Sequence, residues 1–352
     1  MATKLQLMSE LARQTTEQLT QSKENWTGFL DSAAWLYKYP FHEQVLIHAQ
    51  RPDATACAPI ELWNNTFRRW VNKGAKGIAI IDDSGQKPTL RYVFDVSDTN
   101  TRYNVPFSLW QTRPEYEAQI VEELQNHFGN IGVEDTDFSS VVLGIAINAV
   151  SDNYDDYKNE LLKAAGNSAL ADMSDDEISS TFMVLLMTSV AHTVFVRLGI
   201  DAAAIFHGDE YESVTLFNSP DTIAQLGAAT SDISEMVLRQ IERSVRSVER
   251  QERDTLAKSQ QVLQNEDRKS ERSVEHGTQL QAERGLPDSR YRDGRAAEGD
   301  YRQIRDDEEG VSQGAPEWNV QRSAASEQAD RASAGDRQDG AGTGRTDDGA
   351  DG

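Results

Sequence analysis

The sequence predicts an α+β N-terminal domain, a mainly α-helical second domain and a disordered C-terminal tail. Apolar residues change from helical spacing to strand alternation near residue 77, and helical spacing returns after residue 113. Five of the six tryptophans lie before residue 111, which supplies aromatic side chains for a compact N-terminal core. Large apolar residues become scarce after about residue 255. We therefore expect domains at residues 1–110 and 111–254 and a low-complexity tail at 255–352.

Composition sets the class of protein. The hydrophobic fraction of 38% is below the ~45–50% apolar content of a typical globular domain, and the mean hydropathy is -0.62. Part of the chain is therefore expected to be unfolded. A single cysteine, Cys57, excludes an internal disulfide and suits a reducing compartment. The start is polar and lacks the apolar region of a signal peptide, and no uninterrupted apolar run reaches the ~18 residues of a membrane span. These features predict a soluble, cytoplasmic protein.

Helices dominate the first 66 residues. Asn25 is expected to cap the second helix and Pro40 to stop it, while Pro59 suits the first position of a short helix that carries Trp63. The other predicted helices here span residues 4–22 and 41–50.

Strand patterns follow this helical segment. Residues 77–81 form a short apolar strand that ends at a turn-rich Asp82-Asp83-Ser84-Gly85 segment. Residues 89–96 alternate between apolar and polar side chains and are predicted to be its hairpin partner.

The second domain has mostly helical spacing. Ser174 or Asp175 can cap its most apolar helix, which Gly199 would close, and Asp232 can cap the last one. A short strand is expected at residues 213–217. The predicted helices span residues 113–129, 138–150, 152–165, 176–198 and 221–226 and continue from 232 onward.

Charge is distributed unevenly along the chain. The formal net charge is -23, to which residues 1–100 contribute zero, residues 101–238 contribute -17 and residues 239–352 contribute -6. A field of this sign repels phosphate and argues against non-specific nucleic-acid binding by the whole protein. Any site for a polyanion must therefore be local. Residues 63–80 are the candidate, because they hold four basic residues and no acidic one.

This basic strip combines three side-chain chemistries. Cations can bind phosphate oxygens, glycines allow a backbone to come close to a ligand, and aromatic faces can stack on unpaired bases at roughly 1–3 kcal/mol each. The alternative is a solvated hairpin with ordinary surface lysines and core tryptophans. The strip is not a P-loop, because no G-x-x-x-x-G-K-[S/T] pattern is present. The candidate binding residues are Arg68, Arg69, Lys73, Gly74, Lys76, Gly77, Trp63 and Trp70.

The segment from Thr55 to Thr99 resembles the single-stranded-DNA-binding N-terminal domain of the ArdC antirestriction family. The likeness lies in the K-G-x-K-G run at residues 73–77 and in the later Val93-Phe94-Asp95-Val96 strand end. The upstream residues 26–55 resemble the version of this domain at the front of large conjugative-element proteins, which carry helicase- or methyltransferase-type domains further along. The resemblance implies a DNA-binding module of a mobile genetic element.

A peptidase role is not expected. ArdC-type proteins carry a second domain with an H-E-x-x-H zinc motif, in which two histidines bind the metal and the glutamate activates water. The best-matching helix here keeps only His192, so we predict no catalytic residue, no metal ligand and no cofactor. His42, His48 and Cys57 are expected to be structural, and the aspartates near residues 152–156 and 175–177 to be solvated helix starts.

The sequence therefore predicts a non-catalytic module that holds single-stranded DNA by a basic K-G-x-K-G hairpin during conjugation, with no membrane partner. Downstream helicase or methyltransferase domains, or relaxosome proteins, are the expected protein partners. The alternative from a different class is an acidic antirestriction factor that mimics DNA or binds another protein. A DNA mimic needs carboxylates spaced along one face, whereas here they cluster at helix starts and in the tail.

Overall fold

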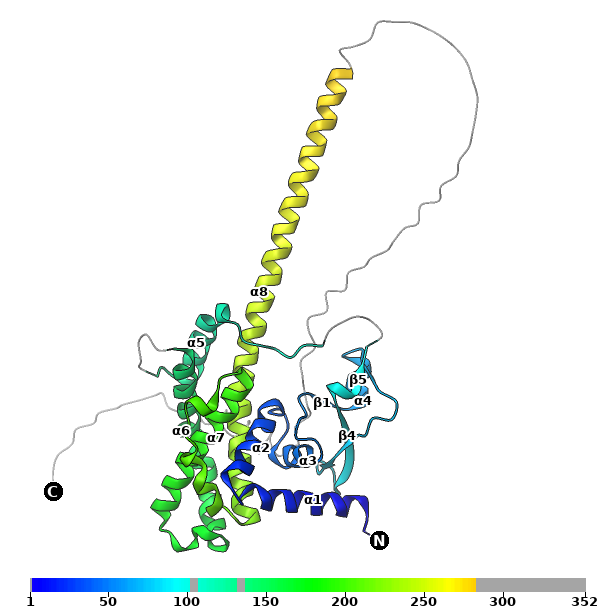
Figure 1. Ribbon diagram of the computed structural model, residues 1–352. Coiled ribbons are helices and arrows are strands. Elements are labelled where there is room, and N and C mark those ends of the chain that lie inside the picture. The colour runs from blue at the N-terminus through cyan, green and yellow to red at the C-terminus, as the bar shows by residue number, and fades with distance from the viewer. Residues whose placement is uncertain (1, 102–106, 132–136, 283–352) are drawn as a thin grey trace, which may run out of the picture. The chain divides into compact units, whose positions relative to one another are not determined.

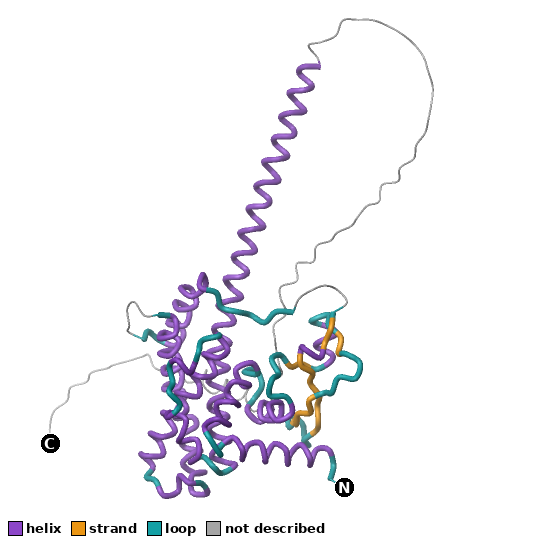
Figure 2. Tube along the Cα trace, viewed as in Figure 1, coloured by secondary structure: helices purple, strands orange, loops and turns teal. Residues whose placement is uncertain are grey.

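The computed structural model describes residues 2–101, 107–131 and 137–282. The described residues divide into two compact units: the first holds residues up to 245, and the second holds residues 246–282. The first unit has the predicted fold class, with helices and a small antiparallel sheet at its N-terminal end followed by a mainly helical part (Figure 1; Figure 2).

Helices α1 (Lys4–Leu19), α2 (Lys23–Trp35) and α3 (Phe41–Gln50) begin the chain. Ser22 caps α2, because its hydroxyl accepts the backbone N–H of Asn25 at 3.3 Å. The predicted cap at Asn25 is therefore wrong: its side-chain amide donates to the carbonyl of Gln18 at 2.8 Å instead. Pro40 does separate two helices, but as the N-cap residue of α3, since α2 has already ended at Trp35.

The strands form two small sheets. Strands β3 (Ile78–Asp82) and β4 (Thr89–Asp95) pair antiparallel, with Ile78 opposite Val93, which confirms the predicted hairpin. Strand β1 (Cys57–Ala58) lies on the other side of β4 and gives the order β1-β4-β3. Strands β2 (Trp70–Val71) and β5 (Thr99–Asn100) make a separate two-stranded sheet.

Two apolar clusters hold the sheet. On one side, residues of β3 and β4 pack with Tyr39, Leu46 and Ile47 from the region of α3, and with half-buried Met8 and Leu11 of α1. The second cluster centres on Trp63 of α4 (Ile60–Asn65), which packs with Ala56, Ala58, Phe67, Phe94 and Phe107. Helices and hairpin therefore depend on each other for burial.

The second part of the first unit consists mainly of α5 (Pro114–Phe128), α6 (Phe138–Ala164), α7 (Asp175–Leu198) and the start of α8. Helix α6 is continuous, where two helices were predicted, because the polar residues near Ser151 lie on its exposed face. A 3-10 helix, η5 (Asp209–Leu216), replaces the strand predicted at residues 213–217. The other 3-10 turns are η1 (Val96–Asp98), η2 (Ala165–Asn167), η3 (Ala169–Asp172) and η4 (Ala202–Ala204).

Helix α8 runs from Pro220 to Ala282. It therefore passes through Asp232, which is an exposed residue inside the helix and not its cap. The predicted tail also begins too early, because residues 255–282 are helical. The rest of the predicted tail lies outside the described residues.

Buried polar contacts join the N-terminal helices to α7 and α8. The Trp26 indole donates to the hydroxyl of Ser189 at 2.9 Å, and the Tyr37 hydroxyl donates to Glu242 at 2.7 Å. Lys38 forms an ion pair with the same carboxylate at 2.7 Å. The first unit thus runs across the predicted boundary at residue 110.

Helix α7 is the only helix among the described residues whose length and composition would allow it to cross a membrane. However, 67% of its apolar window is buried inside the protein. A capping box formed by Ser174 and Glu177 starts the helix, and Gly199 ends it in a left-handed conformation, as its sequence predicts. Helix α7 is therefore a core helix of the first unit.

Gly227 gives a test of the contact between α3 and α8. A methyl group at this position would lie 2.2 Å from Cε2 of Phe41, whereas a methyl group at Gly28 in α2 meets no atom within 4 Å. We expect Gly227→Ala to lower the free energy of unfolding by about 1–3 kcal/mol through overpacking. Gly28→Ala should instead raise it by up to about 1 kcal/mol, because alanine favours helix. Urea denaturation of both variants measures the difference, and equal effects would contradict this packing.

Candidate nucleic-acid interface

The K-G-x-K-G segment forms a turn between the two sheets. It leaves β2, which pairs with β5, and enters β3, which pairs with β4. The backbone N–H of Ala75 donates to the carbonyl of Asn72 at 3.0 Å, and Gly74 has a φ of 89°. The prediction that this segment is the loop of a hairpin is therefore wrong, because its two flanking strands do not pair with each other.

Asn72 anchors the start of this turn. Its backbone N–H donates to the carbonyl of Asp98 at 2.8 Å, and its side-chain oxygen accepts the amide of Asn100 at 2.6 Å. The carboxylate of Asp98 in turn binds the guanidinium of Arg51, at the end of α3. The turn is thereby fixed to the helical part of the unit.

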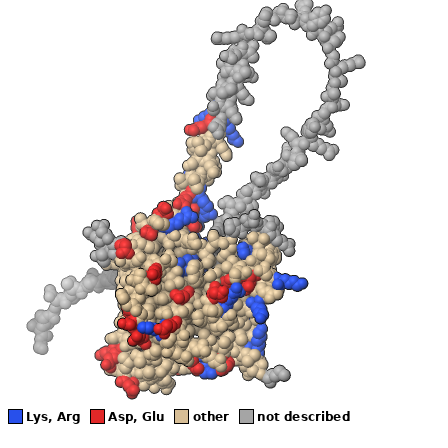
Figure 3. Space-filling model, viewed as in Figure 1, with Lys and Arg blue, Asp and Glu red and all other residues tan. Residues whose placement is uncertain are grey.

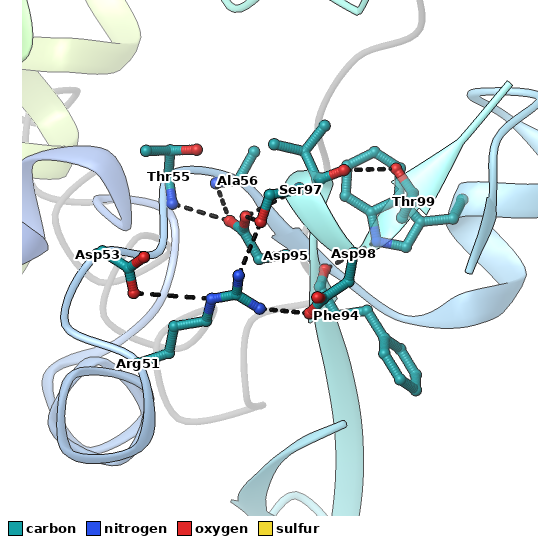
Figure 4. A network of polar contacts seen from close by, with 11 residues as sticks. Arg51, Asp53, Thr55, Ala56, Phe94, Asp95, Ser97, Asp98 and Thr99 are labelled. Atoms are coloured by element: carbon teal, nitrogen blue, oxygen red, sulfur yellow. Dashed lines mark hydrogen bonds and ion pairs between the residues drawn. The ribbon is translucent and has the colours of Figure 1, made fainter. Parts of the chain in front are cut away.

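A polar network around Asp95 holds the strands behind the turn (Figure 4). The Asp95 carboxylate, only 2% exposed, accepts the backbone N–H groups of Thr55 at 2.8 Å and Ala56 at 3.0 Å. It also accepts the N–H of Ser97 at 2.9 Å and its hydroxyl at 2.6 Å. Arg51 adds a bond to the Ser97 hydroxyl at 2.8 Å. One carboxylate thus joins the segment before β1 to the end of β4.

This arrangement determines the ionisation of Asp95. Burial by itself would raise the pKa of the carboxyl group, but the hydrogen bonds from the Ser97 side chain and from the N–H groups of Ala56, Ser97 and Thr55 outweigh it and lower the pKa below its usual value. The charged form is therefore the one that stabilises the fold.

Three of the predicted cations lie exposed around the turn. Lys73 and Lys76 belong to it, and Arg68 precedes β2. Arg68 has a φ of 53°, and among the described residues it is the only one other than glycine with a positive φ. An L-residue in this region carries a strain of order 1–3 kcal/mol, and such strain is often found at functional sites.

Arg69 has a different role from its neighbours. Its Nε donates to the hydroxyl of Thr99 at 2.7 Å, and its Nη2 donates to the carbonyl of the same residue at 3.1 Å. The guanidinium carbon also lies 5.9 Å from the ring centroid of Phe107. These contacts join the chain before β2 to β5, so Arg69 is a structural part of the site.

The two glycines are also needed for different reasons. Gly74 is exposed and has a positive φ that favours glycine. A methyl group at Gly77 would lie 3.1 Å from the ring of Phe94 and 3.2 Å from that of Tyr92. Gly77 therefore allows the turn to approach β4, a close approach within the protein itself.

The two predicted aromatic residues are in different environments. Trp63 is fully buried, and its indole donates to the carbonyl of Phe94 at 2.8 Å. A base cannot reach this ring in the folded protein, so we remove Trp63 from the candidate interface. Trp70 in β2 is half-buried and stays beside the turn.

Sequence reasoning missed Tyr92. It is 38% exposed on β4, its ring lies against Gly77, and the ammonium group of Lys4 lies 4.6 Å from its ring centroid. The alternation of β4 could have indicated an outward-facing position for Tyr92, but only the fold brings Lys4 from α1 to it. The candidate interface therefore consists of Arg68, Trp70, Lys73, Lys76, Tyr92 and Lys4.

Charge is separated over the surface of the first unit. In Figure 3, several basic side chains lie along the right-hand edge, on the side of the strands, and acidic side chains predominate at the lower left. Exposed acidic residues of α6 and the start of α7 include Asp152, Asp155, Asp156, Asp175 and Asp176. The basic turn is therefore separate from the acidic helices.

His192 is buried in α7. Its Nδ1 lies 2.8 Å from the Tyr211 hydroxyl and its Nε2 lies 2.9 Å from a carboxylate oxygen of Asp31, so the imidazole joins α7 to η5 and α2. Cys57 is fully buried as well, and burial raises the pKa of its thiol above the ordinary range. Among the described residues, no group of three or more His, Cys, Asp or Glu side chains could hold a metal ion.

Comparisons with protein-family models, curated proteins and solved structures found no match to this chain. The resemblance to the ArdC family therefore stays a prediction.

Replacing Asp95 tests the network beneath the turn. Because its folded pKa lies below the value of about 3.9 in an unfolded chain, Asp95 stabilises the protein above that pH, and this stabilisation is lost as the pH falls through the folded pKa. We expect Asp95→Asn to cost about 2–3 kcal/mol at neutral pH, since charge-assisted hydrogen bonds are lost, and less at about pH 3. Urea denaturation at both pH values measures this cost.

Asp82 supplies the matched control. It accepts the same pair of bonds from Ser84, at 3.1 Å from the N–H and 2.6 Å from the hydroxyl, and no bond from a distant segment is shown for it. Asp82→Asn should cost less than about 1 kcal/mol. A cost for Asp95→Asn that is equally small, or that does not change with pH, would contradict the account of the network.

Proposed function

We propose that this protein binds single-stranded DNA through the turn at residues 73–77 and the strands beside it, as a non-catalytic module related to the ArdC type. The observation that carries the proposal is the combination of exposed Lys73 and Lys76 with a half-exposed aromatic ring, Tyr92, on a chain of net charge -23. Binding to a single strand needs both parts, since cations follow the phosphates and an aromatic face stacks a base.

The arrangement favours a flexible strand over a duplex. Stacking on Tyr92 requires an unpaired base, because the bases of a duplex are stacked on each other. Lys4 lies over the ring of Tyr92 on a long side chain, and it can move to a phosphate when a base takes its place. Arg68 and the turn lysines supply the other cations. The acidic helices would repel DNA from the rest of the unit and confine it to this edge.

Expected partners follow from this proposal. The module would hold a strand during transfer of a mobile element, in the cytoplasm, and pass it to helicase, methyltransferase or relaxosome proteins. No cofactor is needed for this task.

Salt dependence tests the electrostatic part. Four cations on the strand would give a slope of log affinity against log salt near -3, at about -0.7 per phosphate neutralised. The double variant Lys73→Ala/Lys76→Ala should reduce the slope by about 1.4 and weaken binding of a labelled oligonucleotide in fluorescence anisotropy. The control, Lys158→Ala/Lys163→Ala, makes the same charge change on α6. If both double variants weaken binding equally, net charge and not this turn is responsible.

Replacing Arg68 separates binding, measured by the same anisotropy assay, from stability, measured by urea denaturation. Glycine adopts a positive φ freely, so Arg68→Gly should leave the free energy of unfolding unchanged or raise it by up to about 1 kcal/mol. It should still weaken binding, because one phosphate contact is lost. Unchanged affinity would remove Arg68 from the interface.

Tyr92 tests the stacking part. Tyr92→Phe keeps an aromatic face and should bind like the wild type, whereas Tyr92→Leu should lose roughly 1–3 kcal/mol of binding free energy for a single strand. Neither change should alter the weak binding of a duplex of the same sequence. Equal binding of both variants to the single strand would show that Tyr92 does not stack a base.

A further inference from the structure

We propose that a second copy of this chain docks along the distal part of α8, residues Arg246–Ala282, and that the two helices form a two-stranded coiled coil. This inference is independent of the proposed DNA site. It starts from the exposure of α8: from Arg250 to Glu266 every residue is exposed. The large apolar side chains Leu256, Val262 and Leu263 are 62%, 56% and 61% exposed.

These apolar residues follow a helical pattern. At 3.6 residues per turn, Ile241, Val245, Val248, Leu256, Val262 and Leu263 fall within an arc of about 120°. The first two are buried in the first unit, and the same face continues along the helix into its exposed part, where the apolar residues are eight, six and one positions apart. We call the last four residues the distal stripe. Apolar side chains gathered on one face of a helix are the pattern of a helix that packs against another helix.

Stability also favours a partner. Most of the stability of a helix in a protein comes from packing of its apolar face and not from intrinsic propensity. Three oppositely charged pairs spaced four residues apart in this part of α8, such as Glu249 with Arg253, would stabilise the helix by only about 0.3–0.5 kcal/mol each. A second helix on the distal stripe would remove Leu256 and Leu263 from water, at about 25 cal/mol for each Å² of apolar surface covered.

The charge of this segment fits a second copy as the partner. Residues 246–282 contain seven Lys or Arg and seven Asp or Glu residues, a net charge of zero, although the whole chain carries -23. Two such segments can lie side by side without net repulsion, and their mixed charges can pair across the interface. Glu252 and Ser259 lie within the arc of the stripe, so the apolar seam is interrupted and association should be reversible.

Sedimentation equilibrium of the full chain tests the proposal over about two decades of concentration. The wild type should form a dimer as concentration rises, with a parallel increase in helical content by circular dichroism, and added salt should not dissociate it. The variant Leu256→Glu/Leu263→Glu should stay monomeric at every concentration, because charges in the seam oppose packing. Both residues are exposed in the single chain, so the variant folds normally.

The matched control moves each substitution by one residue. Ala257→Glu/Gln264→Glu makes the same change in charge on the opposite side of α8, and it should form dimers like the wild type. A wild-type chain that is monomeric throughout, with unchanged helical content, would show that α8 stands alone or awaits a different protein, and would overturn the proposal. Dimers that persist in Leu256→Glu/Leu263→Glu would overturn it too, because another surface would then be responsible.

Discussion

The Asp95 carboxylate is the contact on which the strand region depends. It is almost fully buried, yet four hydrogen bonds satisfy it, two of them from backbone N–H groups some forty residues earlier in the chain. These bonds fix the start of β1 against the end of β4 and set the position of η1. From η1, the carbonyl of Asp98 holds Asn72, and Asn72 begins the basic turn. The candidate site is thus built on a buried charge.

Structural and binding tasks are divided among similar residues. Arg51 and Arg69 are occupied by partners within the protein, at Asp98 and Thr99, whereas Arg68, Lys73 and Lys76 are exposed. Rigid anchors behind a group of exposed cations keep the entropy cost of binding low, because the turn does not have to be ordered by its ligand. The same division applies to aromatic residues, since Trp63 belongs to the core and Tyr92 to the surface.

Two regions of this chain depart from its strong negative charge, and each has a proposed partner. The proposed partner of the basic turn is single-stranded DNA, and that of the neutral distal part of α8 is a second copy of the chain. Residues 101–238, which lie between them in the sequence, contribute -17 to the net charge of -23. A pair of chains would hold two basic turns, and a strand bound to both would gain affinity through effective concentration.

The sequence by itself determined most helices, the β3–β4 hairpin and the local basic strip, because periodicity and charge are properties of neighbouring residues. It failed at Asn25 and Asp232, since Asn and Asp prefer caps but also occur inside helices, and only packing selects between these positions. It also placed the K-G-x-K-G turn in a hairpin and Trp63 at the surface. Strand pairing between β2 and β5, the burial of Trp63 and the approach of Lys4 to Tyr92 join residues about thirty or more positions apart. The tertiary structure alone decided these contacts, because their free energy exists only once the intervening chain has folded.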